Sequence, residues 1–480
     1  MIEVLKPYAE YKESGQAWLG SIPEHWSLLP NRAIFDEVKD RNHPQEEMLS
    51  VTITRGIVRQ KLLLADSSKK DSSNLNKAAY KLVQPNDIAY NKMRAWQGAL
   101  GASSLRGIIS PAYVVMRPRT EANALFYHHL YRTPSFAKEA ERWSYGITSD
   151  MWSLRPEHFK VIFSVLPPPD EQAAIVRFLE HANRKMDGFI RAKRKLIGLL
   201  NEQKQAIIHR AVTRGLHPGV PLKPSGIPWL GDIPAHWEVM QLRQVLSFGP
   251  KNGVSPQASN GSGVLSFSIS AVRDGRINIS GNEKFVELDS VRVTGFRIYK
   301  GDILLVRGNG NVALVGKCGL VDECPENCVY PDILMKLRPN DRMTAEFMVL
   351  AVNSYYVTNQ VSTLAKTSNG AFKVSGATVR SISMMVPPVD EQERLVEAIE
   401  TETKTANTAI VRTEREIALM QEYRTRLTAD IVTGKLDVRT AAAGWPEEKS
   451  DRADSADESD ESDESDLSDG SEEPLLEEQV

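Results

Sequence analysis

Apolar residues recur at steps of three and four in two long segments of the chain, each of which begins just after a run of prolines. Such steps place the side chains on one face of an α-helix, and a face that persists over many turns is typical of a coiled-coil seam. The helices are expected from Asp170 to Thr213 and from Asp390 to Thr433. At 1.5 Å per residue, each would be a strut of about 65 Å. The seam residues are Ile175, Leu179, Ala182, Met186, Phe189, Leu196, Leu200 and Ile207, then Leu395, Ile399, Ala406, Ile410, Ile417, Met420, Leu427 and Ile431.

Two seams of matching length in one chain can bury each other. Because the first helix must run from the end of one globular domain to the start of the next, the connectivity favours an antiparallel pair. The alternative is that each helix packs on its own domain as ordinary core. Lys193 and Gln203 interrupt the first seam, which favours a pairing that is set by more than burial.

Short β-like runs bounded by glycine and proline occupy the segments before the two helices. Each of these segments ends in an apolar strand and a proline stop. We therefore expect an α+β fold, with two tandem-related globular domains separated by two long antiparallel coiled-coil helices in pseudo-two-fold symmetry. The expected parts are 1–166 and 217–386 for the globular domains, 167–216 and 387–437 for the spacer helices, and 438–480 for a disordered acidic tail.

Two sequence signatures occur twice in the same order. Segment 14–26 contains Ser-Gly, Trp-Leu-Gly and Ile-Pro-x-His-Trp, and the same residues return at 225–237. Segment 167–172 reads Pro-Pro-x-Asp-Glu-Gln and returns at 387–392. The offsets are 211 and 220 residues, so the simplest interpretation is two copies of one structural unit in tandem. A duplicated unit is typical of a protein that binds a target with two halves.

The net charge of −3 conceals a basic body and an acidic tail. Residues 447–480 contain 16 Asp and Glu but 2 Lys and Arg, and without them the chain has 57 basic and 46 acidic residues. That balance suits a polyanionic partner such as nucleic acid, although solvated surface charge is the alternative. The tail cannot bury enough apolar surface to fold. With no export signal and no apolar run long enough for a membrane span, we expect a cytoplasmic protein.

The motifs of known catalytic and metal sites are incomplete in this sequence. The glycines of the phosphate-loop-like segment 310–317 have five residues between them instead of four, and Cys318 stands where a Ser or Thr is needed. Cys318, Cys324 and Cys328 lack a fourth zinc ligand nearby in sequence, which favours small buried thiols. His25 and His236 are expected to be buried in turn packing. We therefore predict no catalytic residue, no cofactor and no metal.

Several motifs together resemble the specificity subunit of type I restriction-modification systems. They are the paired Trp-Leu-Gly-x-Ile-Pro-x-His-Trp segments, the Pro-Pro-x-x-Glu-Gln helix starts, Asn-Lys-Met-Arg-Ala-Trp at 91–96 and Ser-Pro-Ala-Tyr at 110–113. The resemblance spans about residues 10–437 and leaves out the acidic tail. It implies that each globular domain is a target-recognition domain that reads one half of a bipartite asymmetric site in double-stranded DNA. It also implies that the helices separate these domains and dock two methyltransferase subunits, which the restriction and translocase subunits then join.

Side chains with forked or planar polar groups are the best candidates to read base edges. Arg and Lys suit guanine, Asn and Gln suit adenine, and aromatic rings can support a displaced base. Phosphate contacts or ordinary exposed loop positions are the alternative for many of them. The candidates are Lys92, Arg94, Trp96, Gln97 and Tyr145 in the first domain, and Arg307, Asn309, Asn311, Lys366, Asn369 and Lys373 in the second.

The first helix also has an outward basic face, which suits either partner docking or solvation. Its candidate docking residues are Arg184, Lys185, Arg191 and Arg194. Two rival functions remain open from the sequence. One is a nuclease or methylase with an unrecognised active site, and the other is a coiled-coil scaffold without DNA sequence preference.

Overall fold

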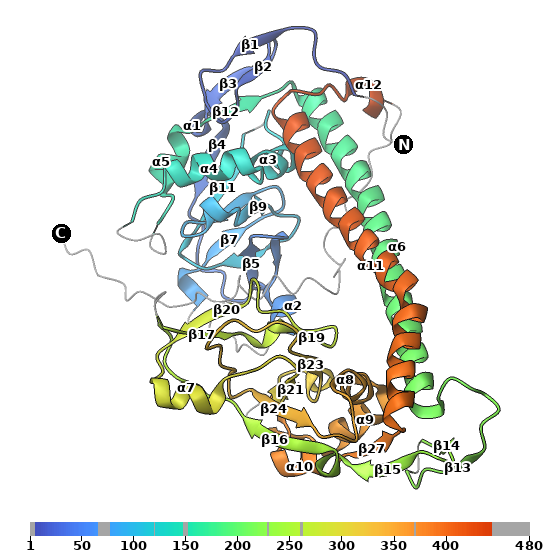
Figure 1. Cartoon of the computed structure of the whole chain (residues 1–480). Helices are drawn as coiled ribbons and strands as arrows, with labels where there is room; N and C mark the ends of the chain where they lie inside the picture. Colours follow the sequence, from blue (N-terminus) through green and yellow to red (C-terminus); the bar gives the residue numbers. More distant parts are fainter. Residues whose placement is uncertain are drawn as a thin grey trace. The chain divides into compact units, whose positions relative to one another are not determined.

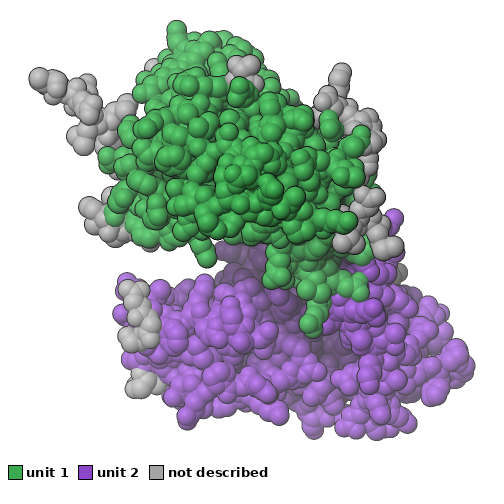
Figure 2. Space-filling model, turned by 90° about the horizontal axis from the view of Figure 1, so that it is seen from above, with its two compact units in different colours: residues 1–192, 415–480 green, residues 193–414 purple. Residues whose placement is uncertain are grey.

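A computed structural model describes residues 5–65, 77–119, 121–146, 152–227, 230–259, 263–368 and 371–443. The chain divides into two compact units, coloured separately in Figure 2. The first combines Met1–Ala192 with Arg415–Val480, and the second is Lys193–Glu414. The expected limits of the target-recognition domains stay a prediction. Of the expected tail at 438–480, residues 438–443 are described and contain helix α12 (Arg439–Ala442), and the rest lies outside the described residues.

The first unit is built on a four-stranded antiparallel sheet in the order β4-β11-β8-β9. Its central strands are rich in Ile, Val, Tyr and Met, and their side chains are buried, as expected for strands covered on both faces. Helix α3 starts where the Asn123 side chain accepts hydrogen bonds from the backbone of the first turn. The strands are β4 (Phe35–Val38), β8 (Ile88–Asn91), β9 (Leu100–Ala102) and β11 (Tyr113–Pro118).

Smaller strand pairs and short helices complete the first unit (Figure 1). The pairs are β1 (Tyr11–Glu13) with β2 (Ser21–Pro23), β3 (Ser27–Pro30) with β12 (Phe163–Leu166), β5 (Leu49–Thr52) with β6 (Gly56–Arg59), and β7 (Lys81–Val83) with β10 (Gly107–Ile109). The helices are α1 (Asn31–Ile34), α2 (Gln60–Ala65), η1 (Lys77–Ala79), η2 (Ala95–Gln97), α3 (Ala124–Tyr131), α4 (Pro134–Arg142), α5 (Pro156–Val161) and α12 (Arg439–Ala442).

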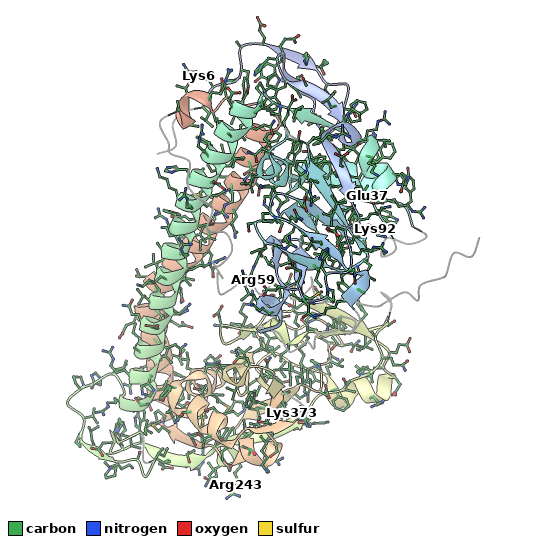
Figure 3. The ribbon with its side chains drawn as sticks, turned by 180° about the vertical axis from the view of Figure 1, so that it is seen from behind. Lys6, Glu37, Arg59, Lys92, Arg243 and Lys373 are labelled. Carbon is green, nitrogen blue, oxygen red and sulfur yellow. The ribbon has the colours of Figure 1, made fainter. Side chains whose placement is uncertain are left out.

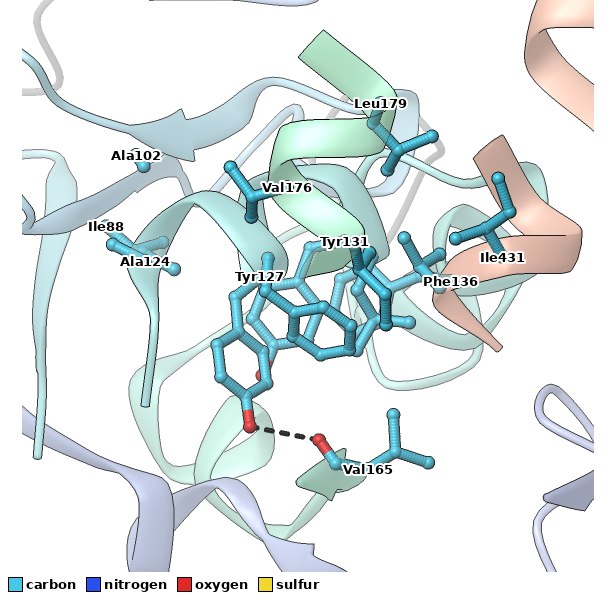
Figure 4. Packing of buried hydrophobic residues seen from close by; sticks show 14 of the residues in the cluster. Ile88, Ala102, Ala124, Tyr127, Tyr131, Phe136, Val165, Val176, Leu179 and Ile431 are labelled. Carbon is cyan, nitrogen blue, oxygen red and sulfur yellow. Dashed lines mark hydrogen bonds between the residues drawn. The ribbon is translucent and has the colours of Figure 1, made fainter. Parts of the chain in front are cut away.

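The core of the first unit joins segments from both ends of the chain (Figure 4). Tyr131 and Phe136 have ring centroids 4.4 Å apart, and the Tyr127 hydroxyl donates to the Val165 carbonyl oxygen at 2.9 Å. Ile431, from the last long helix, is fully buried in this core. The first unit is therefore complete only when residues from beyond position 415 are in place.

The second unit contains a six-stranded sheet in the order β16-β24-β21-β23-β19-β18, antiparallel except for the pair β19–β23. Its strands are β16 (Leu246–Asn252), β18 (Val272–Arg273), β19 (Arg276–Ile277), β21 (Ile303–Val306), β23 (Cys318–Leu320) and β24 (Leu334–Pro339). Further strands are β13 (Leu222–Pro224), β14 (Asp232–Pro234), β15 (Glu238–Gln241), β17 (Val264–Phe267), β20 (Glu283–Val286), β22 (Gly308–Asn309), β25 (Lys366–Ser368), β26 (Ala371–Lys373) and β27 (Ser383–Val386). The helices are η4 (Leu242–Gln244), η5 (Ile269–Ala271), α7 (Ser290–Phe296), η6 (Val312–Leu314), α8 (Ala345–Asn353), α9 (Tyr355–Leu364) and α10 (Gly376–Arg380).

Two long helices, α6 (Pro169–Arg214) and α11 (Val389–Val432), contain 46 and 44 residues. In the first unit, the start of α6 shares a core with the end of α11, where Arg424 forms an ion pair with Asp187. In the second unit, the end of α6 shares a core with the start of α11, and Arg210 lies 3.0 Å from Glu402. The helices thus pair antiparallel. The predicted α+β fold with two long paired helices is confirmed.

The predicted seam is correct at the ends of the helices and wrong in part of the middle. Ile175 and Leu179 are buried, as are Leu427 and Ile431, but Phe189 is 43% exposed and Leu196 is 40% exposed. The buried ends contact both the other helix and the core of a globular part, so the alternative of packing on the unit's own core also holds in part. A helix with 3.6 residues per turn drifts away from a strict 3.5-residue seam, and Ile190 is buried in place of its neighbour.

Among the described residues, no helix has both the length and the apolar character needed to cross a membrane.

Candidate nucleic-acid interface

The repeated sequence motifs meet at a glutamate in each unit, which is buried in the first unit and half-buried in the second. In the first, the Trp26 indole N–H donates to Glu171 Oε1 at 3.0 Å, and His25 Nε2 lies 2.8 Å from Oε2. The Tyr8 hydroxyl donates to the same carboxylate at 2.5 Å. In the second, Glu391 binds Trp237 at 3.1 Å and His236 at 2.7 Å. The motifs therefore fix the start of each long helix to its globular part.

The expectation that both histidines are buried is wrong. The side chains of His25 and His236 are 42% and 44% exposed. Their ring nitrogens are nevertheless held by the glutamates, because that carboxylate sits at the first turn of the helix and can accept from the tryptophan and the histidine together. These contacts join two motifs, which differs from the turn packing that the sequence led us to expect.

The glutamine after each glutamate makes a second joint. The Gln172 amide nitrogen donates to the carbonyl oxygens of Glu121 and Pro167, while its oxygen accepts the backbone N–H of Asn123. Gln392 binds Arg342, Pro387 and Thr344 in the same way. These contacts reach the backbone just before α3 in the first unit and just before α8 in the second. The two units therefore share this backbone arrangement, although their surface side chains differ.

A buried aspartate anchors the central strand of each unit at its start. Arg117 donates two hydrogen bonds to Asp87, at 2.8 and 2.9 Å. Arg338 donates two to Asp302, at 2.9 and 2.7 Å. Each arginine lies on the neighbouring strand, so the ion pair fixes the register of β8 against β11 and of β21 against β24. The loops that follow β8 and β21 therefore leave corresponding places in the two sheets.

In the first unit, the loop after β8 contains four of the five predicted DNA-contacting residues. Asn91 Oδ1 accepts the Met93 backbone N–H at 3.0 Å, and the Trp96 indole N–H donates to the Met93 carbonyl oxygen at 2.9 Å. Trp96 also packs on Trp152, with ring centroids 5.6 Å apart. These contacts give the loop a fixed shape. Lys92, Arg94 and Trp96 are half-buried, and Gln97 is exposed.

The fifth residue, Tyr145, belongs to a neighbouring segment that touches this loop. The Leu154 backbone N–H donates to the Lys92 carbonyl oxygen at 2.9 Å. One residue earlier, Ser153 forms a β-bridge with Tyr145. Tyr145 is 58% exposed and lies 5.1 Å, ring to ring, from His158. The structure thus brings Tyr145 and the 91–97 loop together on one surface.

In the second unit, the predicted residues also lie on two segments that touch. The Val374 backbone N–H donates to the Arg307 carbonyl oxygen at 2.9 Å. In the small sheet β22-β26-β25, Lys373 pairs with Gly308 and with Lys366. Arg307, Asn309, Lys366 and Lys373 therefore gather at one place, and Figure 3 labels Lys92 and Lys373 in their units. Asn369 lies outside the described residues.

The two asparagines of this loop also build its turns. Asn309 Oδ1 accepts the Asn311 backbone N–H at 2.9 Å, and Asn311 Oδ1 accepts that of Ala313, also at 2.9 Å. Such bonds are typical of asparagine in turns. The amide oxygens are engaged in the loop, which leaves the amide nitrogens as the groups that can contact a ligand.

The cysteines do not form a metal site in the part of the chain that is described. No group of three or more His, Cys, Asp or Glu side chains is arranged to hold an ion there. Burial raises the pKa of the Cys318 and Cys328 thiols to about 12, so both remain protonated at neutral pH.

No family model matches the chain, but curated proteins match it over nearly its whole length. It is 23% identical over 465 residues to the type I restriction enzyme EcoKI specificity subunit of Escherichia coli strain K12. This match covers 90% of the chain and 97% of that protein. It is 22% identical to the StySPI specificity subunit of Salmonella potsdam, over 90% of the chain and 96% of that protein. Over nearly its whole length, the chain is similar to type I restriction enzyme specificity subunits.

A solved structure on complex assembly and conformational transition of the type I R-M system contains a chain with a similar fold. The TM-score is 0.57 at 16% identity, and the match covers 86% of this chain and 99% of that chain. The names of the curated relatives, which are specificity subunits, agree with the prediction that this chain is not itself an enzyme.

Two basic residues beside Lys92, Lys81 and Arg41, are not indicated by the sequence patterns. Lys81 begins β7, follows Tyr80 and is 7% exposed. Burial, followed by the positive charges of Lys92 and Arg41, lowers the pKa of Lys81 to about 8. A lysine inside an otherwise apolar strand was the available signal, because lysine is rarely buried without a reason.

The predicted docking residues lie on the half of α6 that belongs to the first unit, or just beyond it. Arg184, Lys185 and Arg191 are exposed and Arg194 is half-buried. Their role in docking stays a prediction.

Proposed function

We propose that the chain is the DNA-reading subunit of a type I restriction-modification complex. It would read a bipartite asymmetric site in double-stranded DNA, one half with each globular part, and confer that specificity on methyltransferase and restriction subunits. The observation that carries the proposal is the pair of matching backbone contacts, Leu154 to Lys92 and Val374 to Arg307. They set two different groups of polar side chains on one shared frame.

The chemistry of the two surfaces supports reading of two different sequences. The first presents Lys92, Arg94 and Gln97 with the aromatic Tyr145. The second presents Arg307 with two lysines that face each other across β25 and β26. Lysine and arginine favour guanine edges or phosphates, and glutamine favours adenine, so the two halves of the target should differ in base sequence. Asymmetry of the site follows from the difference in side chains.

The names of the relatives support the partner assignment, since each is called the specificity subunit of a restriction enzyme. We propose that two methyltransferase subunits bind the chain, with docking residues Arg184, Lys185, Arg191 and Arg194 on α6. Restriction and translocase subunits would join through the methyltransferases. Basic side chains on α6 have no close equivalent on α11, where Glu and Thr are common, so the two docking sites would be similar but not identical.

Methylome sequencing tests this function. Cells that express the chain with the methyltransferase encoded beside it should carry one modified bipartite motif, which disappears when the chain is omitted. If no motif depends on the chain, the proposal is wrong. Cleavage or methylation of DNA by the purified chain alone, with Mg²⁺ or S-adenosylmethionine, would favour a nuclease or methylase instead. Protein binding without any DNA sequence preference would favour a scaffold.

A further inference from the structure

Lys81 is a buried cation on the short strand β7 of the first unit. Its residue is 7% exposed, and its ammonium group donates a hydrogen bond to the Tyr113 carbonyl oxygen. That single neutral acceptor leaves the ammonium group with donors to spare. A buried charge without an ionic partner costs stability, and such residues are concentrated at functional sites.

Two further cations lie on the segments that flank Lys81. Arg41 follows β4 and forms an antiparallel β-bridge with Lys81. Tyr113, which accepts the lysine's hydrogen bond, pairs across the sheet with Asn91, the residue before Lys92. Three neighbouring segments therefore bring three positive side chains to one region at the end of β8.

The carboxylates of this region are engaged elsewhere. Glu37 lies 2.6 Å from Lys160 and 3.6 Å from Lys39, and Asp40 lies 2.8 Å from His43. Within the described residues, neither Arg41, Lys81 nor Lys92 forms an ion pair. Burial is the largest cause of the low Lys81 pKa. The nearby charges that act on it are those of Lys92, Arg41, Glu37 and Lys39. The three cations lower the pKa by more than Glu37 raises it, so their effect adds to that of burial.

We propose that Arg41, Lys81 and Lys92 form a phosphate-binding site that holds one backbone phosphate of the DNA duplex. This inference rests on the proposed function and assigns the three residues a positioning role. A phosphate offers several charged oxygens, which can accept from the arginine fork and from both ammonium groups. Such a contact sets the register of the duplex without reading its sequence, and the neighbouring loop would then meet the base edges.

The second unit has no lysine at the corresponding spacing from its anchoring aspartate. Lys81 precedes Asp87 by six residues, and the residue six before Asp302 is Phe296. The Lys251 ammonium group lies over that ring, 4.8 Å from its centroid. We therefore assign the phosphate-binding site to the first unit, and its loss should weaken DNA binding without altering the second half of the motif.

The salt dependence of DNA binding measures phosphate contacts directly. Affinity of the full-length protein for a random duplex would be measured over a range of salt, for the wild type, Lys81→Met and Arg41→Gln. Each phosphate contact contributes about 0.9 to the slope of log affinity against log salt, so each variant should lower the slope by up to that amount. Both variants should lose affinity for random and for target duplexes by the same factor. Lys12→Met removes one charge from the separate β1–β2 pair and should leave the slope unchanged.

Proton uptake supplies a second readout, because a bound phosphate stabilises the charged form of Lys81. Calorimetry at pH 8 in buffers of different ionisation enthalpy should show proton uptake on DNA binding by the wild type, and less by Lys81→Met. Arg41 is exposed, so Arg41→Gln keeps the test valid if Lys81→Met does not fold.

Unchanged slopes in both variants would overturn the phosphate-binding site. Binding of inorganic phosphate that depends on Lys81, with unchanged DNA slopes, would also overturn it, because the site would then serve a free anion. A wild-type protein that binds DNA with no sequence preference would instead overturn the proposed function, and a slope change in the variants would still support the phosphate contact.

Discussion

The backbone N–H of Leu154 donates a hydrogen bond to the carbonyl oxygen of Lys92 across 2.9 Å. Val374 makes the same contact, at the same length, with Arg307. Both contacts use main-chain atoms, so they tolerate any side chain at the two acceptor positions and any but proline at the two donor positions. The frame can therefore stay constant while the residues that it presents to a ligand change.

Removing one base-reading cation from either loop should affect one half of the DNA target. Arg94→Ala should relax or abolish recognition of the first half-site, and Arg307→Ala that of the second. Loss of a good base contact costs about 1–3 kcal/mol. Methylome sequencing would show the degenerate position. Equal loss in both halves for each variant would point to a defect in folding or assembly.

The ion pair between Arg117 and Asp87 should contribute much more to stability than the exposed ion pair of Arg119, which lies just after the same strand. Asp87 is buried, so Arg117→Ala leaves an uncompensated charge, and we expect a loss of about 2 kcal/mol, less than for a fully buried pair because the arginine is partly exposed. Arg119 pairs with the exposed Asp36, and Arg119→Ala should have little effect. Urea denaturation of the two variants tests the difference, and equal losses would contradict it.

Glu171→Ala should loosen the joint between the first long helix and its globular part. It removes the acceptor of the fully buried Trp26 indole and of Tyr8, with an expected loss of about 3 kcal/mol in the free energy of unfolding. Glu391→Ala is the matched variant and should cost less, because Glu391 accepts from Trp237 and His236 without a tyrosine. Thermal denaturation would rank the two, and the reverse order would contradict the assignment.

The buried Lys81 should make stability depend on pH in a defined direction. Its pKa is about 8 in the folded protein, below the ordinary value near 10.4, so between these values the unfolded chain binds more protons. The contribution of Lys81 to the free energy of unfolding therefore rises with pH between these two values. Below them, the buried charge destabilises the folded protein to its full extent. Lys81→Met should be more stable than the wild type at pH 7, and the advantage should shrink at pH 9.5. A constant difference would contradict the shift.

Paired insertions in the long helices should lengthen the gap in the target, which is the stretch of base pairs between the two half-sites. The contacts of Asp187 with Arg424 and of Arg210 with Glu402 place Leu200 opposite the region of Val411. Four residues inserted at both positions add about 6 Å, which corresponds to one or two base pairs. Insertion near Leu200 alone would shift one of the two ion pairs out of register and should impair binding. Methylome sequencing gives the length of the gap. An unchanged gap with the paired insertion would disprove the idea that helix length sets the distance between the half-sites.

The sequence predicted the large features of the fold because they repeat. The two signatures, the helix starts at Asp170 and Asp390 and the loop residues from Lys92 to Gln97 were visible as patterns. The pattern did not show which residues are buried in the middle of the helix pair, since Phe189 and Ile190 fit a step of three and of four from Met186 equally well, yet only Ile190 is buried. Lys81 was missed because its neighbours Arg41 and Lys92 are close only in the folded sheet. The bond from Leu154 to Lys92 is a main-chain contact, which side-chain patterns do not indicate.

The core that contains Ile431 has a consequence for synthesis of the chain. A ribosome that has translated residues 1–414 has made the whole second unit, whereas the first still lacks Leu427, Ile431, Val432 and Val438. The half that is made first must therefore mature last. A premature stop near the end of the gene would damage the N-terminal half of the protein, and a nascent first unit would expose its aromatic core to chaperones until translation is nearly complete.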